Sequence, residues 1–180
     1  KKQKKPRRRT RPPPSLPPPL FCRMPIKDLL VHVSPGDYDE GMPSYPGAIL
    51  ARHVVTKGAQ IGGVAGLLAG TFQALRGRSF GVVPTYCAVG TFLIGAPLGM
   101  AAVVAKAYTI DADGVIDRGY RITHNQGQTL ADALSLGGAV GAASVSLAPR
   151  RFLGAASVGL VAGLASYPAI KLVDKAFLKD

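Results

Sequence analysis

The sequence predicts an all-α membrane protein with four transmembrane helices in two glycine-rich hairpins, preceded by an extended, basic, proline-rich N-terminal arm. Three observations predict this fold class. The apolar residues lie in uncharged blocks, glycine recurs within those blocks every four residues, and most of the positive charge sits at the N-terminus. A soluble domain would instead spread its apolar residues at a period of 2 or 3.6 residues.

The arm covers residues 1–27 and accounts for most of the net charge of +12. It holds ten of the 22 Lys and Arg residues and no acidic residue, so the rest of the chain is close to neutral. Prolines at 12–14 and 17–19 disfavour a helix and favour an extended conformation. We expect the arm to lie on an acidic surface, such as phospholipid headgroups, a partner protein or RNA. The basic charge describes the arm and does not predict a nucleic-acid-binding fold.

A turn-rich, interfacial approach is expected over residues 28–57, ahead of a four-helix membrane domain over residues 58–170. About 20 helical residues cross a hydrocarbon core. The uncharged runs that meet this requirement, or come close to it, cover residues 58–75, 80–105, 133–149 and 152–170. A polar loop, 106–132, separates the two hairpins, and residues 171–180 form a C-terminal tail. Because no run contains an ionisable Asp, Glu, Lys, Arg or His, a proton pump working through these helices alone is not expected.

Small residues at four-residue spacing form ladders along the predicted spans. Residues four apart share one helix face, where the lack of side chains lets two backbones approach closely. A second ladder in the third span runs through Gly138, Ala142 and Ser146. The residues expected to pack helices are Gly58, Gly62, Gly66, Gly70, Ala74, Gly95, Gly99, Gly137, Gly141, Gly159 and Gly163. Some of these faces are expected to meet the chain's own spans and others neighbouring subunits.

The two short connections are positively charged. They contain Arg76 and Arg78 in one turn and Arg150 and Arg151 in the other, with no acidic residue. The positive-inside rule places both on the matrix or cytosolic side, and their arginines are candidate contacts for anionic lipid.

No catalytic, cofactor-binding or metal-binding residues are predicted. Cys22 and Cys87 read as unpaired thiols, and the three histidines (32, 53 and 124) share no ligand spacing and are expected at the interface. The stretch TIDADGVIDRGY places Thr109 and Tyr120 where a calcium loop needs its first and last acidic ligands. It is therefore interpreted as an Asp-Gly turn.

The sequence resembles the mitochondrial inner-membrane protein-import translocase family. The likeness covers about residues 37–170 and rests on the acidic turn GDYDEG, on Lys57, on the first glycine ladder in TKGAQIGGVAGLLAGTFQAL, and on LSLGGAVGAA. Gly137 and Gly138 fit the Gly-Gly of the family signature, whereas Arg121 and Asp132 do not keep its spacing. Within the family, the chain is most similar to the accessory subunit of respiratory complex I that shares the four-span fold.

The resemblance implies a non-enzymatic, multi-pass subunit of the mitochondrial inner membrane. Its implied partners are membrane-arm subunits of complex I and phospholipid such as cardiolipin, with no small-molecule substrate and no cofactor. One alternative is a translocase subunit whose helices line a path for incoming polypeptide. Another is a membrane anchor that binds RNA through the arm, and deletion of residues 1–19 would then abolish RNA binding alone.

Overall fold

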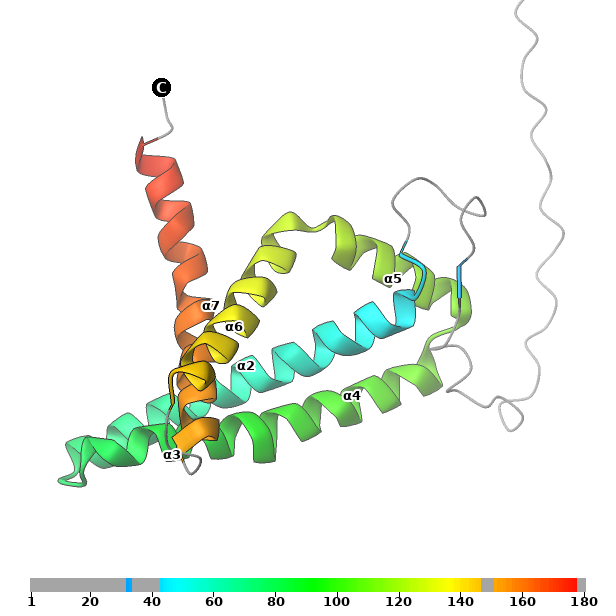
Figure 1. Cartoon of the computed structure of the whole chain (residues 1–180). Helices are drawn as coiled ribbons and strands as arrows, with labels where there is room; N and C mark the ends of the chain where they lie inside the picture. The colour runs from blue at the N-terminus through cyan, green and yellow to red at the C-terminus, as the bar shows by residue number, and fades with distance from the viewer. Residues whose placement is uncertain (1–31, 34–42, 147–150, 178–180) are drawn as a thin grey trace, which may run out of the picture.

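The computed structural model describes residues 32–33, 43–146 and 151–177, and these residues form helices and their connections without a β-strand (Figure 1). All-α architecture is thus confirmed for this part of the chain. Several predicted features lie outside the described residues. They are the arm, most of the approach before residue 43 with its acidic turn, Arg150, and the last three residues of the C-terminal tail, 178–180.

The first helix pair consists of α2 (Pro46–Leu75) and an antiparallel return segment, residues 80–109. The return segment is one continuous rod made of η2 (Phe80–Val82), α3 (Val83–Ala88), the π-helix η3 (Val89–Gly95) and α4 (Ala96–Thr109). Figure 1 shows α2 and α4 running side by side. Proline stands in the first turn of α2, where its missing N–H would have no helical partner in any case. Pro84 and Pro97 lie at the starts of α3 and α4, inside the continuous return segment.

The second helix pair consists of α6 (Gln126–Ser144) and α7 (Phe152–Phe177), which pack along each other. The beginning of α7 also contacts α3 and α2, so the two pairs meet near the turn that follows α2 (Figure 1). A small apolar core joins them, formed by Ala59 of α2 with Leu160 and Val161 of α7.

The interval 106–132 is mostly helical, which corrects the expectation of a polar loop. It contains the end of α4, all of α5 (Ala112–His124) and the first turns of α6. Asp113 and Gly114, expected to form an Asp-Gly turn, instead lie in the first turn of α5. Asp111 caps this helix by accepting a 3.0 Å hydrogen bond from the Gly114 N–H. The helix forms because its apolar face, Val115 and Ile116, is buried while its charged face stays exposed.

Two helices of the described chain are long and apolar enough to cross a membrane: Phe80–Thr109 and Phe152–Val173. They contain the predicted runs 80–105 and 152–170. Two other helices do not meet this criterion: α2, which contains the run 58–75, and α6, which contains residues 133–144 of the run 133–149. Their surfaces are rich in glycine, alanine and polar residues, which contribute little to mean hydropathy.

Candidate functional site

The glycine ladder of α2 faces the return segment. A Cβ placed on Gly58 would lie 2.9 Å from the Gly99 Cα, and one on Gly70 would lie 2.9 Å from the Val83 Cα. Between them, a Cβ on Gly66 would lie 2.9 Å from the Cα of Cys87. These distances leave no room for a side chain, so the two helices touch backbone to backbone. The ladder ends at Ala74, which is also buried.

The π-helix sets the register on the other side of this contact. Gly90 and Gly95 both meet Gly62, and a Cβ on Gly62 would overlap the Gly90 carbonyl and lie 2.8 Å from the Gly95 Cα. In an α-helix, residues five apart point about 140° away from each other. The wider turn of a π-helix brings them back toward one face. Gly90 therefore belongs to the contact, although its five-residue spacing hides it from a search for four-residue ladders.

In the second helix pair the backbones meet through Gly138 on α6 and through Gly159 and Gly163 on α7. A Cβ on Gly138 would overlap the Gly159 carbonyl, and a Cβ on Gly163 would lie 3.0 Å from the Ser135 Cα. The structure places Gly137 and Gly141 differently: nothing lies within 4 Å of a Cβ at either position. The contact within the chain thus uses the second α6 ladder, and the first ladder remains exposed.

Five polar side chains form a second kind of contact, between α2 and α6, which we call the polar cluster: His53, Lys57, Gln60, Asp132 and Ser135. The Asp132 carboxylate accepts hydrogen bonds from Lys57 Nζ at 2.7 Å and Gln60 Nε2 at 3.3 Å, and its other oxygen lies 2.7 Å from His53 Nδ1. Gln60 also donates to Ser135 Oγ at 3.0 Å and accepts from Lys57 at 3.1 Å. The network therefore joins the two helix pairs through hydrogen bonds that leave neither carboxylate oxygen without a partner.

The centre of the cluster is held away from solvent, with Gln60 3% exposed and Ser135 fully buried, while the Lys57 side chain remains 34% exposed. Burial by itself raises the pKa of the Asp132 carboxyl, but the hydrogen bonds and positive charges of Lys57 and His53 outweigh it. The net result is a pKa below the ordinary value of 3.8. Asp132 is therefore an ionised carboxylate at neutral pH, and His53 Nδ1 carries the hydrogen that it accepts.

Sequence reasoning missed this cluster. It assigned His53 to the interface and noted Asp132 only for its spacing from Arg121. One signal was available: His53, Lys57 and Gln60 fall at i, i+4 and i+7, which places them on one face of a helix. Their partner is 72 to 79 residues away in the sequence, so only the fold brings it to that face.

The predicted arginines lie at the end of the molecule where α2 turns back. Arg76 caps α2, Arg78 follows two residues later, and Arg151 immediately precedes α7. All three are exposed. The start of α7 lies against α3, since a Cβ on Gly154 would be 2.9 Å from the Pro84 Cβ.

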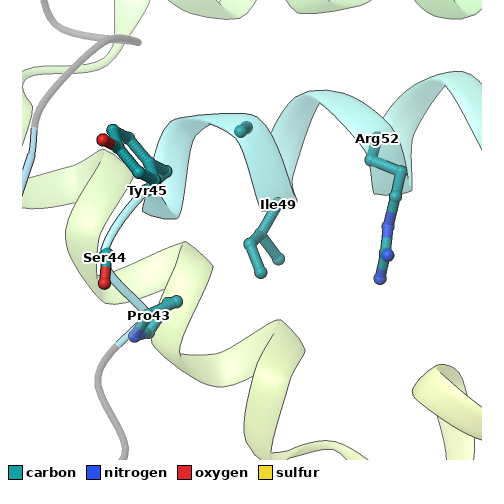
Figure 2. Close-up of a pocket in the computed structure, with 6 residues that line it drawn as sticks. Pro43, Ser44, Tyr45, Ile49 and Arg52 are labelled. Atoms are coloured by element: carbon teal, nitrogen blue, oxygen red, sulfur yellow. The ribbon is translucent and has the colours of Figure 1, made fainter.

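A shallow hollow of about 360 Å³ lies beside the first turns of α2. Figure 2 shows Arg52 and Ile49 extending from the same side of the helix, with Tyr45 at its start and Pro43 below. Tyr45 is 57% exposed and Arg52 is exposed as well. The hollow thus lacks the enclosed polar groups that fix a small ligand.

Among the described residues, no group of three or more His, Cys, Asp or Glu side chains is arranged to hold a metal ion. Comparison of the sequence with protein families and with curated proteins finds no match. The comparisons therefore assign the chain to no family.

Proposed function

We propose that the protein is a multi-pass membrane protein that acts as a non-catalytic packing subunit of a larger assembly. The observation that carries the proposal is the combination of backbone contacts through glycine with large apolar side chains left on the outside. In lipid, helices associate through close packing and weak Cα–H···O contacts, because burial of apolar surface provides no drive between them.

The exposed apolar residues lie on both helix pairs. They include Ile61 at 71%, Leu93 at 71% and Leu172 at 68% exposure. In water, an apolar surface of this kind would favour aggregation. In a membrane, acyl chains or neighbouring helices would cover it without an energetic cost. The exposed α6 ladder of Gly137 and Gly141, with Val140 beside it, offers one such face to a neighbouring helix.

In the proposed topology, α2, the return segment, α6 and α7 are four spans in two hairpins. The polar cluster, the end of α4 and the end of α7 then lie toward one side, and the two arginine-bearing turns lie on the other. His53, Lys57 and Asp132 precede the uncharged runs 58–75 and 133–149, so the cluster sits where the spans enter the bilayer. There it can fasten the hairpins while Lys57 keeps access to water.

The family resemblance supports the proposal that this role is performed in the mitochondrial inner membrane, by an accessory subunit of the complex I membrane arm. Packing of the glycine faces would support assembly and stability of the arm, while electron transfer and proton pumping would belong to other subunits. The alternative, a subunit of the protein-import translocase, shares the same fold and differs in its partners.

A native gel of the source membranes in mild detergent separates these two assignments. The gel is probed for this chain and stained in parallel for NADH dehydrogenase activity. We expect the chain to co-migrate with the active high-mass band, and its depletion to destabilise that band. Migration in a smaller inactive complex that holds an arrested preprotein would replace the complex I assignment with the translocase. Extraction of the chain from membranes by alkaline carbonate would overturn both.

A further inference from the structure

The end of the molecule where α2 turns back carries only positive charge among the described residues. Arg76, Arg78 and Arg151 lie there, and none of them forms an ion pair in the described part of the chain. The acidic residues of that part all lie at the N-cap of α5, within α5, near the start of α6 or in the late turns of α7: Asp111, Asp113, Asp117, Asp132 and Asp174. The positive charge at this end therefore has no acidic partner among the described residues and is open to an external anion.

The turn between α2 and α3 presents its arginines in a fixed way. Gly77 adopts φ +93°, a left-handed conformation that glycine tolerates best, and the Arg76 N–H donates to the Phe72 carbonyl at 3.2 Å. The Arg78 N–H donates to the Gln73 carbonyl at 3.3 Å. The Arg76 guanidinium lies 4.4 Å from the centre of the Phe72 ring, which restricts its position further.

Apolar side chains surround these arginines on the outside of both helix pairs. Five large apolar side chains within four residues of these arginines are between 47% and 75% exposed: Phe72, Leu75, Phe80, Phe152 and Leu153. A cation beside exposed aromatic and leucine side chains matches the boundary between phosphate groups and acyl chains in a bilayer. Guanidinium groups also bind phosphate in a bidentate manner, which ammonium groups cannot do.

We propose that Arg76, Arg78 and Arg151 bind the phosphate of anionic phospholipid in the leaflet at this end, with the exposed Phe and Leu side chains against its acyl chains. This inference rests on the proposed membrane topology. It assigns a lipid surface to the arginine end alone. At the opposite end Lys57 and Arg121 pair with Asp132 and Asp117, and that end is not part of the assignment.

The test uses the full chain in nanodiscs of equal parts phosphatidylglycerol and phosphatidylcholine. Native mass spectrometry counts the phosphatidylglycerol molecules that remain bound after release into detergent. The triple variant R76Q/R78Q/R151Q removes the proposed site. The control R52Q/R118Q/K171Q removes the same charge from exposed positions at the other end. We expect about tenfold weaker retention in the first variant, since each surface cation contributes to anionic-lipid binding, and no change in the control.

Equal retention in both triple variants would overturn the inference, as would an equal loss in both. Circular dichroism checks that each variant keeps its helices. If the first triple variant does not insert, the single variants R76Q and R151Q replace it, each with an expected two- to threefold loss. Resistance of the wild-type chain to carbonate separates the two proposals. If the chain resists carbonate but all variants retain phosphatidylglycerol equally, only this inference is overturned. If carbonate releases the chain, the proposed membrane topology is overturned too.

Discussion

Within each helix pair the backbones meet directly through glycine, whereas α2 and α6, which belong to different pairs, are joined by hydrogen bonds among five polar side chains. The glycine contacts are spread over whole helices and tolerate no added atoms. The polar cluster is confined to one end of the interface and depends on one carboxylate. The difference predicts two effects. A larger side chain at a contact glycine should separate the helices within a pair, and removal of a charge from the polar cluster should weaken the contact between the two pairs.

The largest effect is expected from Gly62→Val. Its added atoms would collide with the backbone of both Gly90 and Gly95, which cannot move without separating α2 from the return segment. We expect a loss of about 3 kcal/mol or more in the free energy of unfolding. Unfolding by SDS titration in mixed micelles measures it.

Gly137→Val is the matched control for this variant, since it adds the same atoms in a helix at a position with open space. Its free energy of unfolding should stay within about 0.5 kcal/mol of the wild type. Similar losses in the two variants would contradict the assignment of the close contacts.

A smaller effect is expected from Asp132→Ala, which removes the carboxylate that joins the pairs. Loss of one partner from a buried ion pair costs about 3–5 kcal/mol, and the cost here should be nearer 2 kcal/mol because Lys57 keeps one third of its side chain exposed. The same SDS titration measures it, with Asp113→Ala on the exposed face of α5 as control. An Asp132 variant as stable as the control would mean that the cluster does not fasten the pairs.

Acidification should reduce the contribution of Asp132 to the free energy of unfolding, as the Asp132→Ala substitution does. Because the folded state lowers its pKa, the folded state binds the proton less well than the unfolded state does. The stabilisation is therefore fully present above the ordinary value of 3.8 and is lost as the pH falls through the lower, folded value. The stability gap between wild type and Asp132→Ala should narrow as the pH falls below about 4. A gap as wide at about pH 3 as at about pH 5 would contradict a lowered pKa for Asp132.

The smallest effect is expected from Thr91→Val in the π-helix. Among the described residues, Thr91 Oγ1 is the buried side-chain oxygen that has no hydrogen-bond partner. Replacing the hydroxyl with a methyl group of similar shape should change the free energy of unfolding by less than about 1 kcal/mol, or increase it. A loss comparable to that of Asp132→Ala would show that the hydroxyl binds a group that the described residues do not supply.

The sequence predicted the α2 ladder because a four-residue spacing has one structural meaning in a helix. In α6 it selected Gly137 and Gly141, whereas α7 meets Gly138. Gly137 and Gly138 have the same spacing to the next small residue, so the sequence alone does not show which face meets α7. It missed Gly90 because that residue fits only a π-turn. It also missed the bond between His53 and Asp132, because a 79-residue separation carries no local pattern. The sequence analysis did not predict the helix α5, because the charged residues of this interval suggested a loop. Its apolar residues nevertheless keep a helical spacing.

Cysteine accessibility tests the four-span topology most directly. Single cysteines replace Arg78, Arg151 or Lys106 in a chain whose native Cys22 and Cys87 are changed to serine, and a membrane-impermeant maleimide is applied to either side of sealed vesicles. We expect positions 78 and 151 to react from one side and position 106 to react from the other. Reaction of all three positions from the same side would contradict the four-span topology.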